Sequence, residues 1–193
     1  MARYEVSRIW ERKPEGIASR VREALDLGLE QAPANRARVF FRADDVAVPG
    51  AMCEAMFQVF RERDAVLCPA VVPSWLTGPR WEVLKRQAGE GWQRWSWHQH
   101  GWKHVNHEPQ GRKYEFGPSR TSEALKKDLA LGKHRLESLL GQSFVPIFTP
   151  PWNRVSFQAM QNMLELGFSG ISRDLTAKPV PPAGLPDFQV NVD

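Results

Sequence analysis

Trp97-His98-Gln99-His100-Gly101-Trp102-Lys103-His104 carries a strand-like pattern directly into a loop rich in histidine. Four of the chain's five histidines fall between His98 and His107. Earlier, Phe40-Phe41-Arg42-Ala43-Asp44-Asp45 is an apolar run that ends abruptly on two carboxylates. Imidazole nitrogens and carboxylate oxygens are ligands that zinc prefers, and three such ligands leave a coordination position for water. Together the two stretches predict a divalent-metal site of the kind that hydrolases use.

Helical and strand patterns alternate on both sides of these stretches. Apolar residues at helical spacing predict helices over residues 14–30, from 49–50 to 60, 81–87, 121–140 and 155–166. Pro33-Ala34-Asn35 breaks the first helical pattern. Short apolar runs predict strands over residues 39–45, 65–72, 92–98, 144–148 and 168–172, with a sixth over 189–192. This α/β alternation favours parallel strands with outer helices, in a barrel or in an open doubly wound sheet.

Polar residues follow directly after three of the predicted strands, at Asp44-Asp45, His100 to His107 and Thr149 to Arg154. The carboxyl ends of parallel strands meet on one face, which is where barrel enzymes carry their function. Agreement among three strand ends is stronger than any single motif. There is no GxGxxG motif or P-loop to indicate a nucleotide fold.

The bulk composition fits one globular domain over residues 1–193, with a helical lead-in over 1–36 and the barrel over 37–193. A net charge of +4 without any long Lys/Arg block argues against a nucleic-acid partner. We expect no membrane span, no signal peptide and a cytoplasmic location, because no apolar run is long enough. Cys53 and Cys68 show no ligand spacing, so we expect two buried thiols.

His100 and His104 stand four residues apart, a spacing that places both rings on one side of a helical turn. We favour this pair as ligands over pairs that use His98 or His107. Of two adjacent carboxylates, one can ligate the metal while the other accepts a proton from water.

The turn Thr149-Pro150-Pro151-Trp152-Asn153-Arg154 adds groups suited to a substrate. Trp152 would supply a flat apolar wall, and Arg154 could orient a carboxylate or a substrate oxygen. Trp75 and Trp102 also fall just past strand ends, and aromatic faces beside polar groups suit sugar rings.

Over roughly residues 37–175 the chain resembles the polysaccharide deacetylase family, also called the NodB-homology carbohydrate esterases. The family's first motif is a strand that ends on two aspartates, matched by Phe41-Arg42-Ala43-Asp44-Asp45. Its His-x-x-x-His motif matches His100 to His104, and its Arg-x-Pro-aromatic turn is similar to Thr149-Pro150-Pro151-Trp152. Lys113-Tyr114-Glu115-Phe116-Gly117 is similar to a stretch in a divergent branch of the family.

The resemblance implies a distorted (β/α) barrel of about six or seven parallel strands. It implies Asp44 as the catalytic base, with Asp45, His100 and His104 as ligands of one divalent ion. The ion expected is zinc, with cobalt, nickel or manganese as alternatives. Candidate substrate contacts are Trp102, Glu115, Pro151, Trp152 and Arg154.

The chain also departs from the family pattern. Thr149 stands where the family has an arginine that orients the catalytic aspartate, and Arg154, Arg42 and Arg173 are candidates to replace it. Val46 replaces a glycine of the first motif. No histidine follows His134 to match the family's late general acid, and the chain stops at Asp193, where a strand pattern begins. Truncation, another acid or inactivity would each explain this, and we expect the 193-residue chain to lack full deacetylase activity.

Three functions compete at this point. The leading one is a metal-dependent hydrolase that removes acyl groups, such as acetyl, from N-acylated amino sugars, or cleaves another non-peptide C–N bond. Its partner would be a small carbohydrate or N-acyl substrate. The second is a catalytically impaired metal- or carbohydrate-binding protein of the same fold, and the third is a basic nucleic-acid binder. The sequence leaves the oligomeric state open.

Overall fold

A computed structural model describes residues 14–33 and 38–191, and it divides the chain into two units, residues 1–39 and 40–193. In the first unit, the helical pattern forms helix α2 (Ile17–Glu30). No side chain of α2 is buried. The expected break at Pro33-Ala34-Asn35 and the expected strand end at Val192 lie partly outside the described residues, and the expectation about residues 1–13 lies entirely outside them.

The second unit alternates strands and helices as the pattern predicts. Its strands are β1 (Phe41–Val46), β2 (Leu67–Val71), β3 (Trp97–His100), β4 (Phe144–Thr149) and β5 (Gly170–Ile171). Its α-helices are α3 (Ala51–Glu62), α4 (Gly78–Ala88), α5 (Ser122–Leu140) and α6 (Phe157–Glu165). Short 3-10 turns are η2 (Trp92–Arg94), η3 (Gly141–Ser143) and η4 (Pro151–Asn153). The alternation of the predicted elements is thereby confirmed.

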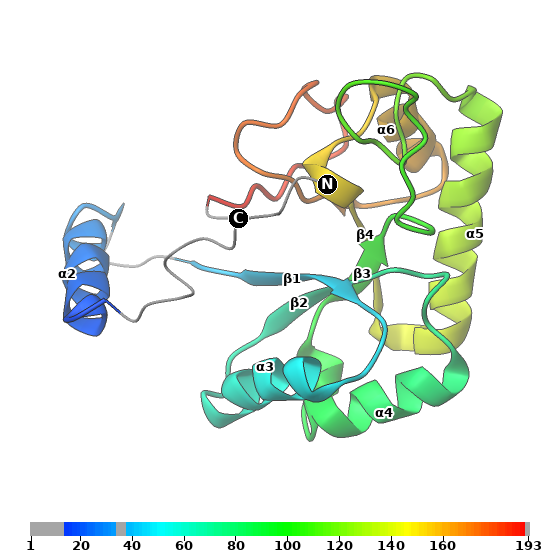
Figure 1. Ribbon diagram of the computed structural model, residues 1–193. Coiled ribbons are helices and arrows are strands. Elements are labelled where there is room, and N and C mark those ends of the chain that lie inside the picture. The colour runs from blue at the N-terminus through cyan, green and yellow to red at the C-terminus, as the bar shows by residue number, and fades with distance from the viewer. Residues whose placement is uncertain (1–13, 34–37, 192–193) are drawn as a thin grey trace. The chain divides into compact units, whose positions relative to one another are not determined.

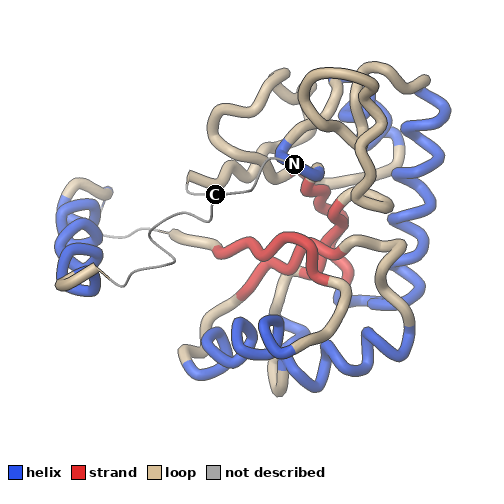
Figure 2. The backbone as a smooth tube through the Cα atoms, viewed as in Figure 1, coloured by secondary structure: helices blue, strands red, loops and turns tan. Residues whose placement is uncertain are grey.

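The five strands form one parallel sheet in the order β1-β2-β3-β4-β5. A doubly wound sheet reverses its strand order, whereas this one advances one neighbour at a time. Because such crossovers are right-handed, the intervening helices all fall on one side of the sheet. Figures 1 and 2 show α3 to α6 as an arc outside the strands. The sequence allowed a barrel or an open doubly wound sheet, and the observed strand order is of the kind that barrels use.

The strand count differs from the expected six or seven. The described residues form five strands, and the segment expected as a sixth makes only the isolated bridges Ile171–Asp187 and Asp174–Val190. Four prolines between residues 179 and 186 remove backbone donors just before this segment, so a ladder has little chance to extend. The third strand also begins later than expected, at Trp97, because residues 92–94 form η2.

Two apolar clusters hold the sheet against its helices. One surrounds Trp97, whose ring packs edge-on at 4.9 Å from Trp81 and 5.9 Å from Phe57, between centroids. The other surrounds Phe148 beneath α5 and α6. Such aromatic pairs contribute about 0.5–1.5 kcal/mol each beyond their buried area. Both clusters combine side chains of the strands with side chains of the helices that cover them.

Three helices begin at a hydroxyl side chain that satisfies an otherwise unpaired backbone N–H. Thr77 caps α4, Thr121 caps α5 and Ser156 caps α6. Each cap is worth roughly 1 kcal/mol. Cys53 and Cys68 are free thiols as expected, but they are half-buried rather than buried. No helix in the described part of the chain is long and apolar enough to cross a bilayer.

Candidate metal centre

Three ligand atoms converge at the carboxyl ends of β1 and β3. Asp45 Oδ1 lies 3.4 Å from His100 Nε2 and 3.4 Å from His104 Nε2. Ligand atoms each about 2.1 Å from a tetrahedral zinc ion are about 3.4 Å apart. The described residues contain one cluster of this kind, Asp45, His100 and His104, whose ligand atoms lie within 4.8 Å of one another. The spacing and the donor set therefore fit a divalent ion.

The hydrogen bonds of His100 fix which of its nitrogens faces the cluster. Nδ1 lies 2.9 Å from the carbonyl oxygen of Thr149, which can only accept, so Nδ1 carries the proton. Nε2 then presents a lone pair toward Asp45, the arrangement that metal-binding histidines use. Without a cation, a hydrogen bond between Nε2 and Asp45 Oδ1 needs one proton between the two atoms. Hydrogen bonding to His100 is the main cause that lowers the pKa of Asp45. A metal ion would replace that proton.

His104 is placed at the cluster by a loop and not by the helical turn that its spacing suggested. Residues 101–107 form no helical turn, so the expectation that one turn aligns His100 and His104 is wrong. His104 instead sits in a loop with φ 59°. Burial lowers the pKa of His104, which favours the neutral ring that binds metals.

Glu115 holds the loop that carries His104. Its side chain is fully buried, and its carboxylate accepts the backbone N–H groups of Trp102, Lys103 and His104 at 3.1, 2.6 and 3.1 Å. Burial raises the pKa of Glu115, and the three N–H donors oppose that rise. The structure thus places this candidate substrate contact inside the protein, where it orders a ligand loop. Gly101 makes room for it, since a Cβ there would meet Glu115 Oε2 at 2.0 Å.

Arg42 holds Asp44 beside the cluster. Its Nε and Nη2 donate to the two carboxylate oxygens of Asp44 at 2.8 and 3.0 Å. Its Nη1 and Nη2 also donate across the sheet, to Ser172 Oγ at 3.2 Å and to Asn153 Oδ1 at 3.0 Å. The Arg42 side chain is only 3% exposed, so the fork is rigid. Of the three arginines considered from the sequence, Arg42 contacts Asp44.

A bulge in β1 lets two adjacent carboxylates serve the same site. Neighbouring strand residues normally point to opposite faces. Between Ala43 and Val46 the pairing with β2 shifts by one residue, and Asp45 has φ 61°. A bulge of this kind redirects a side chain. Asp44 therefore stays on the face of Arg42, while Asp45 turns to the histidines.

Backbone strain concentrates at the cluster. Among the described residues, five other than glycine have positive φ, and four of them are Asp45, His104, Trp152 and Asn153. The fifth, Asp64, follows helix α3. Each such conformation costs about 1–3 kcal/mol and persists only where surrounding contacts hold it. Four of the five strained residues therefore lie at the ligand residues and the neighbouring turn.

Aromatic rings flank His104 on two sides. Trp152 lies 4.6 Å and Trp75 5.8 Å from the His104 ring, between centroids. Pro151 is buried against Gly101, and Arg154 is half-buried beyond Trp152. Trp102 packs against the Phe148 cluster. Of the aromatic candidates, Trp152 and Trp75 border the centre.

The two rival histidines lie outside the cluster. His98 is buried, with Nδ1 2.9 Å from the Ser96 carbonyl oxygen and Nε2 2.8 Å from Thr149 Oγ1. Burial lowers its pKa to about 4, so the ring is neutral at neutral pH. His107 is exposed. Thr149, which replaces the expected arginine, therefore accepts from His100 and pairs with His98.

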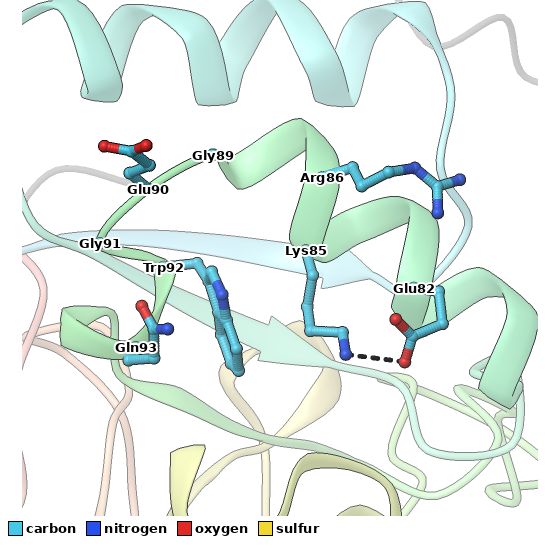
Figure 3. Close-up of a pocket in the computed structure, with 8 residues that line it drawn as sticks. All are labelled: Glu82, Lys85, Arg86, Gly89, Glu90, Gly91, Trp92 and Gln93. Atoms are coloured by element: carbon cyan, nitrogen blue, oxygen red, sulfur yellow. Dashed lines mark ion pairs between the residues drawn. The ribbon is translucent and has the colours of Figure 1, made fainter.

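A hollow of about 570 Å³ lies at the amino ends of the strands, away from the ligand cluster at their carboxyl ends (Figure 3). It is bounded by the end of α4 and by η2, with Glu82, Lys85, Arg86, Glu90 and Trp92 in its wall. Lys85 pairs with Glu82 at 2.7 Å and lies 5.7 Å from the Trp81 and Trp92 ring centroids. Its charged groups point along its surface and do not converge on one position.

Solved structures confirm the resemblance at the level of the fold. The chain is 13% identical to IcaB from Ammonifex degensii (TM-score 0.56), covering 76% of this chain and 66% of that one. It is 15% identical to the Streptococcus pyogenes deacetylase PplD, solved with acetate (TM-score 0.52). That match covers 78% of this chain and 62% of that one. The chain is also 15% identical to a Mycobacterium smegmatis protein described as a polysaccharide deacetylase (TM-score 0.52). That match covers 72% of this chain and 45% of that one.

The chain thus has the α/β fold of polysaccharide deacetylases and spans less than two thirds of the length of each of these structures. No protein-family model matches the sequence, and comparison with curated proteins gives no match.

Sequence reasoning left the positioning role of Arg42 open among three arginines and did not assign one to Glu115. The fork of Arg42 on Asp44 had a local signal, since residues i and i+2 of a strand share a face. The hydrogen bonds that Glu115 accepts had no such local signal, because they depend on where a long loop folds back.

Proposed function

We propose that the chain is a metal-dependent hydrolase that removes an acyl group from an N-acylated amino sugar, or cleaves another non-peptide C–N bond, within a distorted barrel-type fold. The observation that carries the proposal is the convergence of Asp45 Oδ1, His100 Nε2 and His104 Nε2 at spacings that suit zinc. Cobalt, nickel and manganese are alternative ions. When bound, the ion would polarise the acyl oxygen and lower the pKa of water toward neutrality.

Side chains of the protein supply the catalytic base and the surface that holds the sugar. Asp44, held by the Arg42 fork beside the ligands, takes a proton from the attacking water. Each of its oxygens keeps a further lone pair, so the fork orients the base without consuming it. Trp152 offers an apolar face on which a sugar ring can stack.

One observation favours the second candidate, a metal- or carbohydrate-binding protein with impaired catalysis. An amine leaves only when it is protonated, and the described residues place no further histidine at the cluster. Both nitrogens of His98 are already engaged in hydrogen bonds. Turnover therefore decides between the two candidates.

The test measures acetate release from an N-acetylated sugar oligomer by the zinc-loaded chain and by its Asp44→Asn variant. We expect the variant to keep the ion and to lose about 10²–10⁴-fold in kcat. Asp64→Asn is the matched control, since Asp64 also has positive φ but lies on the surface after α3. Loss of the ion in Asp44→Asn would exchange the roles of the two aspartates. An ion-loaded chain that turns over no N-acyl sugar would favour the second candidate.

A further inference from the structure

A concave surface of about 210 Å³ lies next to the metal centre and is separate from the ligands. Three segments distant in sequence build it: the loop around Arg112 and Tyr114, the turn from Trp152 to Arg154, and residues 174–178. The fold therefore brings these segments together at the strand ends, on the side of Trp152.

Positive charge dominates this hollow. Arg112, Arg154 and Lys178 line it, against a single carboxylate, Asp174. Asp174 Oδ1 already accepts the backbone N–H of Thr176 at 2.8 Å and its hydroxyl at 2.6 Å. In the part of the chain that the structure describes, no carboxylate pairs with the three cations. Concave surfaces lined by one sign of charge concentrate ligands of the opposite sign.

Trp152 links the hollow to the centre. One side of its ring faces His104, 4.6 Å away between centroids, and Trp152 also lines the hollow. Lys113 Nζ lies 5.8 Å from the same ring and adds a further cation. A sugar stacked on Trp152 with its acylamino group at Asp45, His100 and His104 would place its other substituents, or its neighbouring ring, among these cations.

We propose that this hollow is a subsite for an anionic group, so that the substrate is an N-acylated amino sugar bearing a carboxylate or a phosphate on the same or an adjacent ring. The inference rests on the proposed function for its sugar, and on the hollow alone for its charge. Guanidinium groups match the geometry of both anions, which fixes the orientation of the sugar as well as its affinity.

Calorimetric binding tests the charge preference without requiring turnover. The probes are N-acetylglucosamine, its phosphorylated form and its uronic acid, each titrated into the zinc-loaded chain. We expect the two anionic sugars to bind at least about tenfold more tightly than the neutral one. The difference should shrink as salt is raised, because these cations are largely exposed. Equal affinity for neutral and anionic sugars would overturn the proposal.

The double variant Arg112→Gln/Lys178→Gln locates the effect. It should bring the ratio of anionic to neutral affinity close to one, whereas Lys85→Gln/Arg86→Gln, which removes the same charge from the hollow of Figure 3, should keep the native ratio. A native ratio in the first variant would overturn the proposal.

The two proposals fail separately. A charge preference that depends on Arg112 and Lys178, without turnover of any sugar, supports the subsite and refutes the hydrolase. Turnover without a charge preference supports the hydrolase and refutes the subsite. The comparison of the phosphate with the uronic acid identifies which anion the subsite takes.

Discussion

The two ends of the sheet differ in almost every respect except that both are hollowed. The hollow at the amino ends, of about 570 Å³, is open and lined by charged side chains that pair locally, as Lys85 does with Glu82. The carboxyl ends bring Asp45, His100 and His104 onto one point. There the backbone is strained, and partners such as Thr149 and Glu115 hold the ligands or their loop.

The comparison teaches that convergence, rather than size, distinguishes the end of the sheet that we propose as functional. Holding three metal ligands together costs strain and requires buried partners, and a surface hollow needs neither. Substitutions at the carboxyl ends should therefore change metal binding, activity or acid stability, and matched substitutions at the amino ends should not.

The largest effect that we expect on folding stability appears at acid pH and depends on His98. Burial lowers its pKa from the ordinary 6.5 to about 4 in the folded chain. Between these values the unfolded chain binds more protons, so stability rises with pH and falls as pH drops from 7 to 4. The contribution is about 3 kcal/mol in the free energy of unfolding.

Urea unfolding of the metal-free chain between pH 4 and pH 7 measures this slope. His98→Gln removes the group and should flatten the slope relative to the native chain. An unchanged slope in that variant would show that His98 is not held neutral by the fold.

The next effect concerns the fork on Asp44. Arg42→Gln should lower kcat about 10²-fold, because a base displaced by about 1 Å loses its geometry. Metal affinity should be retained, since the Arg42 fork holds Asp44 rather than a ligand residue, and this readout also shows that the variant is folded. Arg86→Gln, at the amino-end hollow, is the matched control. Native kcat in Arg42→Gln would mean that Asp44 needs no orientation or is not the base.

The smallest effect concerns the loop of His104. Glu115→Gln keeps the shape of the side chain but turns an N–H₂ group toward one of three backbone donors. Outer partners of metal ligands contribute roughly 10–100-fold in metal affinity, and we expect a loss of this size. Amide hydrogen exchange at residues 102–104 should accelerate in parallel. Glu90→Gln is the control, and native affinity in Glu115→Gln would remove the positioning role of Glu115.

Local patterns were enough to predict the order of elements in the second unit. Apolar spacing identified α3 to α6, and short apolar runs identified β1 to β5, because each element buries one face against the next. The start of β3 was wrong because Trp92 and Trp95 read as strand residues, whereas Trp92 belongs to η2 and its carbonyl accepts the Trp97 indole N–H at 3.0 Å.

The candidate site was predictable in composition but not in construction. The sequence predicted that Asp45, His100 and His104 would meet, yet it explained the meeting by a helical turn that does not form. The structure uses a bulge at Asp45 and the buried Glu115 carboxylate instead. Both depend on contacts between distant segments, which spacing along the chain does not encode.

The most direct test of the central claim is a metal titration. The chain is stripped with a chelator, and zinc is added while binding heat and metal content are measured. We predict one ion per chain in the native protein and in His134→Ala, whose histidine is exposed on α5. Asp45→Ala, His100→Ala and His104→Ala should each abolish tight binding. Absence of binding by the native chain, or native binding by His104→Ala, would contradict the account.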